Sequence, residues 1–253
     1  MVKPDTPPAG PHARAESGRV SFVPTPIGNL ADITLRALDT LRAADLIACE
    51  DTRHTRRLLQ HHSISRPTLS LHGHNEAARI PEIIARVRQG ARIAVVSDAG
   101  TPGISDPGNR LAAACHLHHL PFEILPGPCA IPAALVGSGL PAAEFNFRGF
   151  LPIRKGRREK ALAEALASQT ATTLFYESPH RLLSTLEILA SLDPARLCCI
   201  AREISKTFET FHRAPTAELL NHFSQSSPKG EIVILVAPAN LPSFLTRETP
   251  SPQ

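Results

Sequence analysis

The chain of 253 residues contains no tryptophan, one tyrosine and five cysteines. The cysteines show no Cys-x-x-Cys spacing, which argues against a zinc site, and several lie in apolar runs, which predicts buried and reduced thiols. No apolar run approaches the roughly 20 residues of a membrane-spanning helix, and the amino-terminal residues lack the apolar core of a signal peptide. These absences predict a cytoplasmic protein without a resident metal ion.

Two phosphate-binding motifs are also missing. The chain contains neither Gly-x-Gly-x-x-Gly nor Gly-x-x-x-x-Gly-Lys-Ser/Thr, which argues against a dinucleotide-binding fold and against a P-loop. A hydrophobic content of 42% in a chain of this length is enough for one large domain or two modest ones. The net charge of +4 permits a nucleic-acid partner without requiring one.

Apolar runs alternate with amphipathic stretches in the first half of the chain. Strands are expected over 20–23, 46–49, 68–71, 93–96 and 122–125, and helices over 32–43, 52–61, 81–89 and 107–117. This alternation predicts a parallel sheet with right-handed crossovers. The helix expected over 107–117 starts with a proline, which suits the first turn of a helix.

The regular alternation of predicted strands and helices ends after residue 125. Helices are expected over 131–138, 155–168, 179–190 and 216–223, and strands over 145–150, 172–176, 197–201, 209–213 and 231–236. The late strands follow one another with little helix between them, which predicts hairpins and a mixed sheet. We therefore expect two α/β domains, over 19–125 and 126–238, between a flexible arm (1–18) and a flexible tail (239–253) rich in proline.

Three loops that combine proline with glycine follow apolar strands, at 24–29, 97–108 and 126–128. Loops at the carboxyl ends of strands are where open α/β sheets bind ligands. Because proline has no amide donor, such loops offer more carbonyl groups than donors, which suits a neutral or cationic ligand. The alternative interpretation is that these loops only terminate strands.

Three polar clusters also follow predicted strands, at 50–54, 71–76 and 175–181. In the first, Asp51 and Thr52 suit a helix N-cap as well as a site. The second offers two imidazoles, an amide and a carboxylate without the spacing of His-Glu-x-x-His, so it favours substrate contact or acid–base chemistry over a metal. In the third, Tyr176 is equally compatible with a core position that leaves its hydroxyl solvated.

Basic side chains crowd two segments, at 53–66 and 154–160. Either segment alone is compatible with a solvated helix face. Two such clusters in different parts of the chain favour a surface that follows the phosphates of a nucleic acid.

Together these motifs resemble the tetrapyrrole methylase superfamily of S-adenosylmethionine-dependent methyltransferases, over about residues 20–237. Ser-Asp-x-Gly-Thr-Pro at 97–102, followed by Pro-Gly-Pro at 126–128, carries the resemblance to the superfamily. Glu-Asp-Thr-Arg-His at 50–54 and Tyr-Glu-Ser-x-His-Arg at 176–181 point to its ribosomal RNA branch. The stretch that contains Gly103 and Ser105 departs slightly from the pattern.

The resemblance implies a homodimer in which each chain has two α/β domains and binds S-adenosylmethionine in the cleft between them. The implied reaction is 2′-O-methylation of a cytidine in the decoding centre of small-subunit (16S) ribosomal RNA. The residues expected to border the cofactor are Pro24, Pro26, Gly28, Ser97, Asp98, Ala99, Gly100, Thr101, Pro102, Pro126, Gly127, Pro128, Ala130, Tyr176 and Gly230.

A ribose hydroxyl is a poor nucleophile at neutral pH, so some group is expected to accept or delocalise its proton; the alternative is that positioning supplies the rate and the proton is lost to water. The expected catalytic residues are Asp51, Arg53, His54, Glu76 and Glu177, with Glu50 and His74 as further candidates for the proton acceptor. The expected RNA contacts are Arg56, Arg57, Arg154, Lys155, Arg157, Arg158, Arg181 and Lys206.

Two other functions stay open at the level of the sequence. A C-methyltransferase of a corrin-type tetrapyrrole would need a deep pocket and no basic clusters. A non-catalytic RNA-binding protein would not need intact cofactor loops.

Overall fold

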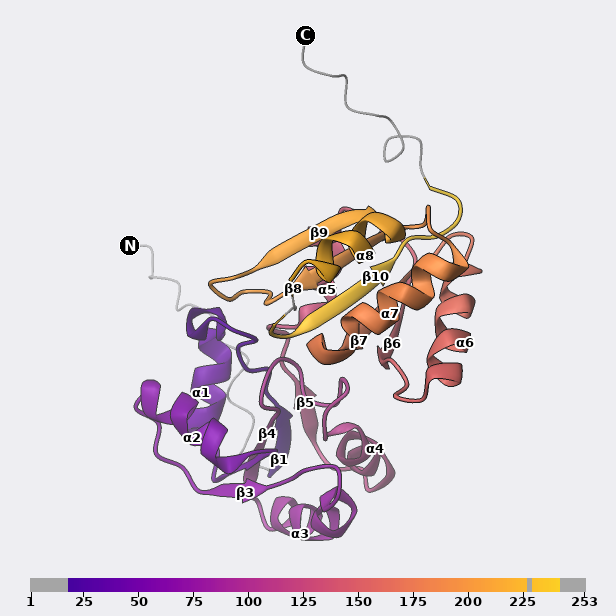
Figure 1. The fold of residues 1–253 in the computed structure, drawn as a ribbon. Helices are drawn as coiled ribbons and strands as arrows, with labels where there is room; N and C mark the ends of the chain where they lie inside the picture. Colours follow the sequence, from indigo (N-terminus) through magenta and orange to yellow (C-terminus); the bar gives the residue numbers. More distant parts are fainter. Residues whose placement is uncertain (1–17, 227–228, 242–253) are drawn as a thin grey trace, which may run out of the picture. The chain divides into compact units, whose positions relative to one another are not determined.

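The computed structural model describes residues 18–226 and 229–241, which fall into two compact units (Figure 1). The first unit comprises the described residues up to Thr25 together with Ile33–Gly127. The second comprises Pro26–Asp32 and the described residues from Pro128 onward. The domain boundaries expected from the sequence stay a prediction. They place Pro26–Asp32 in the first domain, whereas these residues group with the second unit.

The first unit contains one parallel sheet with the strand order β3-β2-β4-β1-β5. Its strands are β1 (Arg19–Phe22), β2 (Leu46–Cys49), β3 (Thr68–Ser70), β4 (Arg92–Val96) and β5 (Phe122–Ile124). Its helices are α1 (Leu35–Ala43), α2 (Thr52–His61), α3 (Glu76–Arg88) and α4 (Asn109–Leu117).

Helices cover both faces of this sheet (Figure 1). Ile93 and Val95 of β4 pack with α3 and α4, whereas Ala94 and Val96 pack with α1 and α2. Successive side chains of a strand point to opposite faces, so a strand buried on both sides must be a continuous apolar run. That requirement explains why the run at 93–96 could be recognised from the sequence.

The second unit contains a mixed sheet with the order β6-β7-β10-β8-β9. Only the β6–β7 pair is parallel. The strands are β6 (Phe145–Phe150), β7 (Thr172–Glu177), β8 (Leu197–Arg202), β9 (Thr210–Pro215) and β10 (Ile232–Val236). The helices are α5 (Ala130–Ser138), α6 (Lys155–Leu166), α7 (Pro179–Leu192) and α8 (Thr216–Ser224), and a 3-10 turn, η1, spans Leu30–Asp32.

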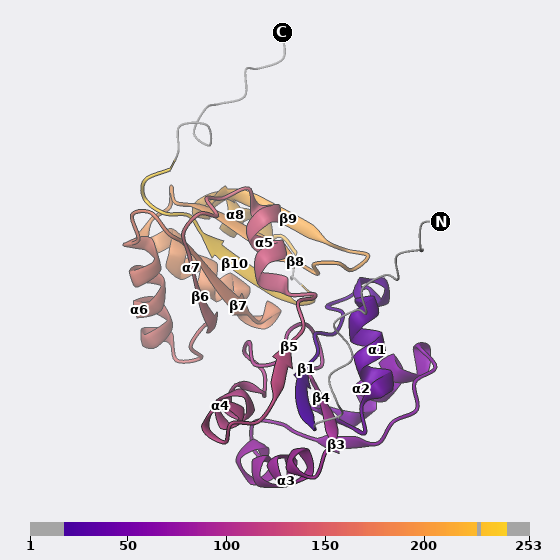
Figure 2. The same cartoon turned by 180° about the vertical axis from the view of Figure 1, so that it is seen from behind.

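Helix α5 covers one face of the mixed sheet, and α6, α7 and α8 cover the other (Figure 2). Ile234 of β10 packs towards α7, and its neighbours Val233 and Leu235 pack towards α5. The predicted fold class, one parallel and one mixed α/β sheet, is therefore confirmed.

Three predicted helix starts are wrong. Helix α3 begins five residues before Pro81, so this proline lies inside the helix. The helix expected from 32 begins instead at Leu35, because the Thr34 hydroxyl caps it by accepting from the Ala37 amide at 3.1 Å. Helix α4 begins at Asn109, after Gly108 with a φ of 129°.

All five cysteines are free, and four of them are buried. Burial raises the pKa of the Cys198 and Cys199 thiols to about 12. The predicted buried, reduced thiols are confirmed for these positions, whereas Cys129 is only partly buried.

The predicted amino-terminal arm and carboxyl-terminal tail lie almost wholly outside the described residues. At the start of the tail, Ala239 and Asn240 donate backbone hydrogen bonds to the carbonyls of Ser168 and Gln169, at 2.8 and 3.0 Å. These first tail residues are therefore attached to the second unit.

Candidate functional site

The five strands of the first unit run in one direction, so their carboxyl ends lie along one edge of the sheet. The segments that leave this edge begin at Val23, Glu50, Leu71, Ser97 and Leu125. Three segments lead into the expected Pro/Gly loops, and two contain the polar clusters at 50–54 and 71–76.

The loops after β1 and β4 are joined by backbone and side-chain hydrogen bonds. Thr25 and Gly100 exchange backbone hydrogen bonds of 2.9 and 3.0 Å. The Thr25 hydroxyl donates to the Ser97 carbonyl at 3.1 Å, and the Ser97 hydroxyl donates to the Gly100 carbonyl at 3.1 Å. Thr25, Ser97 and Gly100 are all buried, so these hydrogen bonds hold the two loops in a fixed position relative to each other.

The loop after β5 packs against the loop after β1. A Cβ atom on Gly127 would lie 2.8 Å from the Pro24 Cβ, so only glycine allows this approach. Pro24 is buried, whereas Pro126 and Gly127 are exposed. The structure therefore brings the expected cofactor residues of the first unit together at one edge of the sheet.

Asp98 connects the loops after β4 and β2, because its Oδ1 accepts from the Asp51 amide at 3.1 Å. Burial raises the pKa of Glu50, and the charge of Asp98 raises it further. The charge of His72 acts in the opposite direction on Glu50. Segments after three adjacent strands thus contribute to one cluster of titratable groups, Glu50, Asp51, His72 and Asp98.

Asp51 is the N-cap of α2, as the sequence suggested it could be. Its carboxylate accepts from the Arg53 amide at 2.8 Å and from the Arg53 Nε and Nη2 at 3.2 and 2.9 Å. The Arg53 side chain, and next the Arg53 amide, hold the pKa of Asp51 well below its usual range, at about 2. Arg53 and His54 are exposed.

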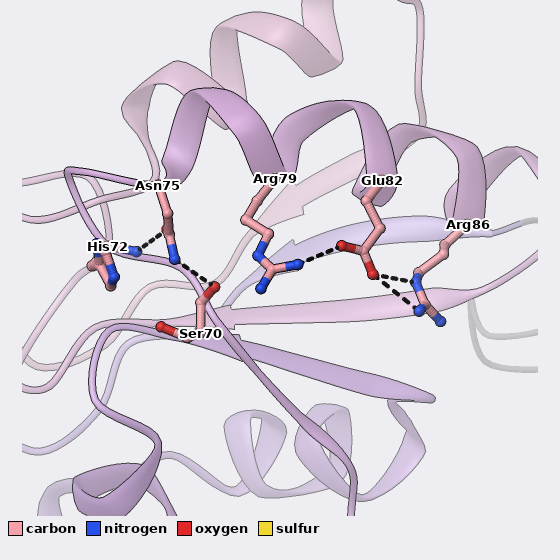
Figure 3. A network of polar contacts seen from close by, with 6 residues as sticks. All are labelled: Ser70, His72, Asn75, Arg79, Glu82 and Arg86. Carbon is pink, nitrogen blue, oxygen red and sulfur yellow. Dashed lines mark hydrogen bonds and ion pairs between the residues drawn. The ribbon is translucent and has the colours of Figure 1, made fainter.

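Asn75 fixes the segment between β3 and α3 (Figure 3). Its Oδ1 accepts from the His72 amide at 2.8 Å, and its Nδ2 donates to the Ser70 carbonyl at 3.2 Å. The His72 Nδ1 is buried and has no hydrogen-bond partner among the described residues. The charge of His72 acts on Glu50, so this imidazole contributes to the electrostatics of the cluster. The cluster at 71–76 expected from the sequence includes His72 and Asn75, but neither is among the individually expected catalytic, cofactor or RNA residues.

Two basic side chains of α3, Arg79 and Arg86, are already paired (Figure 3). Glu82 accepts from Arg79 at 2.9 Å and from Arg86 at 3.0 Å. By contrast, no ion pair joins Arg56 or Arg57 of α2 to another of the described residues, and both are exposed. Helix α2 is therefore the more suitable of the two for phosphate contacts.

Glu76, an expected catalytic residue, is buried and holds the start of α4. Its Oε1 accepts from the amides of Gly108 and Leu111 at 3.0 and 3.3 Å. The first amides of a helix have no partner within the helix, and a carboxylate at this end also interacts favourably with the helix dipole. The structure gives Glu76 a positioning role at the end of the loop that begins at Ser97.

Glu177, also expected to be catalytic, is buried at the end of β7. Its carboxylate accepts from the Ser178 amide at 2.7 Å and from the Thr185 hydroxyl at 2.8 Å, and it forms an ion pair of 2.5 Å with Arg181. Arg181 thus has a carboxylate partner, and its side chain is only 23% exposed. This pair attaches the start of α7 to the sheet.

Lys206 lies in a pocket of acidic side chains in the second unit. It pairs with Glu203 at 2.8 Å and with Glu231 at 3.2 Å, next to Gly230. A Cβ on Gly28 would come within 2.4 Å of the Lys206 Cγ, so the segment with Pro26 and Gly28 packs directly on this lysine. Lys206 therefore holds that segment on the second unit.

The other expected residues of the second unit lie at its sheet and at α5. Tyr176 is partly buried, with its ring 5.0 Å from Phe147 and 5.2 Å from Phe150 between centroids. Ala130 begins α5, and Pro128 precedes it; both are partly buried.

Arg154, Lys155 and Arg157 are exposed at the start of α6. Arg158 differs, because only 6% of it is exposed and its guanidinium donates to the Ile153 carbonyl at 3.4 Å. A buried side chain cannot reach an RNA phosphate, so Arg158 is left out of the RNA surface.

A surface hollow of about 500 Å³ lies between α3 and α4, lined in part by Ile80, Ile84 and Arg110. None of the expected site residues lines this hollow. Among the described residues there is no cluster of His, Cys, Asp and Glu side chains that could hold a metal ion. No helix in the described ranges is both long and apolar enough to span a membrane.

Comparison with known proteins assigns the chain to a family. A "Ribosomal RNA small subunit methyltransferase I" of Escherichia coli O157:H7 is 49% identical over 222 residues, which are 87% of this chain and 77% of that protein. The protein of the same name from Thermotoga maritima is 43% identical over 87% of this chain and 98% of its own length.

Solved structures show the same fold at lower identity. A uroporphyrin-III-C-methyltransferase of Thermus thermophilus superposes with a TM-score of 0.61 at 21% identity, covering 87% of this chain and 94% of that one. The methyltransferase CobJ gives a TM-score of 0.66 at 22% identity, covering 88% of this chain and 95% of that one. Residues 19–220 match the tetrapyrrole (corrin/porphyrin) methylases as a family, and the chain therefore belongs to that family.

Proposed function

We propose that this chain transfers the methyl group of S-adenosylmethionine to the ribose 2′-oxygen of a cytidine in the decoding centre of small-subunit ribosomal RNA. The observation that carries the proposal is the 49% identity, over 87% of the chain, to a protein named as a small-subunit ribosomal RNA methyltransferase. The choice of a cytidine ribose rests on the motifs at 50–54 and 176–181.

The joined loops of the first unit fit S-adenosylmethionine, which supplies an electrophilic methyl group on a cationic sulfonium. Three expected cofactor residues of this unit lack a backbone N–H, namely Pro24, Pro102 and Pro126. Loops with few amide donors are poorly suited to phosphate and better suited to a cation. The carboxylate of Asp98 at the same edge adds a negative charge.

Glu50 is the group best suited to take the proton from the ribose hydroxyl. The other acidic residues expected in catalysis are engaged: Asp51 with Arg53, Glu76 with the start of α4, and Glu177 with Arg181. The Glu50 carboxylate accepts no hydrogen bond from the described residues, and its raised pKa makes it a stronger base than an ordinary carboxylate. Arg53 and His54 border the same site and contact the substrate.

Two exposed basic groups bind the RNA phosphates. One consists of Arg56 and Arg57 on α2, and the other of Arg154, Lys155 and Arg157 at the start of α6. Arg181 and Lys206 already have carboxylate partners, so they hold their local structure and contribute to RNA binding only indirectly. The homodimer, the cofactor cleft between the domains and the cytoplasmic location remain part of this proposal.

The substrate class is tested by incubating the protein with methyl-labelled S-adenosylmethionine and either unmethylated small ribosomal subunits or a corrin precursor. We expect label on a single cytidine ribose, located by nuclease digestion. Arg53→Ala should lose this activity and still bind the cofactor, whereas Arg86→Ala, on a surface arginine paired with Glu82, should behave as the wild type. Label on the corrin, or on a base carbon, would overturn the proposal.

A further inference from the structure

The edge strand β6 contains a bulge that turns Phe150 to the same face of the sheet as Phe147. In the parallel pairing of β6 with β7, Phe147 lies opposite Leu174 and Phe150 lies opposite Tyr176. Strand β6 thus uses one residue more than β7 over this interval. Because successive side chains of a strand point to opposite faces of the sheet, one extra residue moves each later side chain of β6 to the opposite face. Gly149 makes this possible with a φ of 68°.

The bulge assembles three aromatic rings. The Tyr176 ring lies between Phe147 and Phe150, and Tyr176 and Phe147 pack against the core under α5. Phe150 is backed by Tyr176 and yet is 61% exposed. An exposed phenyl face with a second ring packed behind it has the shape that suits stacking on a flat apolar group.

The segment that follows Phe150 carries concentrated positive charge. Arg154, Lys155 and Arg157 lie at the start of α6, whose first turn has no acidic residue. The helix dipole places partial positive charge at the amino-terminal end of α6. Cationic side chains at this end are therefore unfavourable by themselves, and a bound anion is favourable.

Arg158 adds a buried guanidinium to this charge, and no ion pair joins it to another of the described residues. Its buried Nε has no hydrogen-bond partner within the described ranges. Among the described residues, no ion pair therefore joins the cations at the start of α6 to a carboxylate, although Glu159 lies in the next turn.

We propose that Phe150 stacks on an unpaired nucleobase of the RNA substrate while Arg154, Lys155 and Arg157 bind the neighbouring phosphates. Single-stranded RNA is typically recognised by this combination of an aromatic platform and basic side chains. The inference rests on the proposed function, because it assigns part of the RNA surface of the same enzyme.

A tryptophan at position 150 tests the stacking directly, because the chain has no tryptophan of its own. Phe150→Trp is titrated separately with a cytidine-containing single-stranded RNA and with S-adenosylmethionine, and RNA binding is followed in parallel by the anisotropy of labelled RNA. We expect RNA to quench the fluorescence, and to a larger extent than S-adenosylmethionine does through Tyr176, an expected cofactor residue whose ring lies next to Phe150. Phe145→Trp, at the other end of β6, should respond to neither. Quenching by S-adenosylmethionine alone, or bound RNA without quenching, would overturn the proposal.

Substitutions that remove the ring supply a second measurement. Phe150→Leu should weaken the affinity for small subunits about tenfold or more, with unchanged affinity for S-adenosylmethionine, and Phe150→Tyr should restore it. Phe145→Leu is the matched control, since Phe145 is also exposed and lies in the same strand. If the wild type methylates small subunits and Phe150→Leu binds them equally well, only the stacking proposal is wrong. If the wild type methylates no ribosomal RNA, the proposed function itself is wrong.

Discussion

The two neighbouring carboxylates Glu50 and Asp51 have pKa values displaced in opposite directions. Burial, followed by the charge of Asp98, raises the pKa of Glu50 above its ordinary 4.5. Hydrogen bonds from Arg53 lower the pKa of Asp51 to about 2. A carboxylate that stays ionised down to that pH is a weak base, so Asp51 is suited to orienting Arg53 and Glu50 to accepting a proton.

The methylation rate is predicted to depend on the ionisation of Glu50. Glu50 accepts a proton only when it is deprotonated, so the rate should fall as pH decreases through its raised pKa, above the ordinary 4.5. Glu50→Gln should lower the turnover about a hundredfold or more and remove this acidic limb. The measurement is a pH profile of turnover at saturating cofactor and RNA.

Asp51→Asn is the control for this profile. Asparagine keeps an N-cap acceptor for α2 and removes the charge beside Arg53. The variant should have a lower plateau and keep an acidic limb, moved to lower pH, because the Asp51 charge contributes to the raised pKa of Glu50 while Asp51 itself, with a pKa of about 2, does not titrate in that range. An acidic limb that persists in Glu50→Gln would show that another group accepts the proton.

At the scale of elements, Pro81 is the feature that misled prediction of a helix boundary. It is the sixth residue of α3, where its missing N–H deprives the Ala77 carbonyl of its partner in the helix. The Asn75 turn and the burial of Ile83, Ile84 and Val87 hold the helix in spite of this proline. Burial of an apolar face can thus keep a helix continuous through a proline, although a proline in the sequence indicates a helix boundary.

Pro81→Ala is predicted to stabilise the protein. Alanine restores the hydrogen bond to Ala77, and the gain exceeds the loss from a more flexible unfolded chain, leaving about 2 kcal/mol in the free energy of unfolding. Pro132→Ala is the matched control, because Pro132 lies in the first turn of α5, where the N–H has no partner in the helix. Denaturant unfolding measures both, and equal changes in the two variants would contradict this explanation.

At the scale of the whole molecule, RNA affinity is predicted to fall steeply with salt. Each phosphate contact contributes about 0.7–0.9 to the slope of log affinity against log salt. Replacing both Arg56 and Arg57 with alanine should reduce this slope by about 1–2. Arg86→Ala should leave it unchanged, because Arg86 is paired with Glu82. Filter binding to small subunits at several salt concentrations measures the slope, and a salt-insensitive affinity would contradict the RNA surface.

The sequence by itself determined the alternation of elements in the first unit and the edge of the sheet at which the loops meet. These features depend on local properties: apolar runs buried on both faces must be continuous, and proline and glycine mark where a strand ends. The helix 52–61 and the strand 46–49 were predicted with the observed bounds for this reason, and Asp51 was one of two expected N-caps.

Only the tertiary structure decided which of the expected site residues are available for chemistry. Glu76, Glu177 and Arg158 are polar residues in polar clusters of the sequence, but burial and partners distant in the chain give them structural roles. Glu76 meets Gly108 across 32 residues, and Asp98 meets Asp51 across 47. The availability of a carboxylate depends on what folds against it, and that is a property of long-range contacts rather than of local pattern.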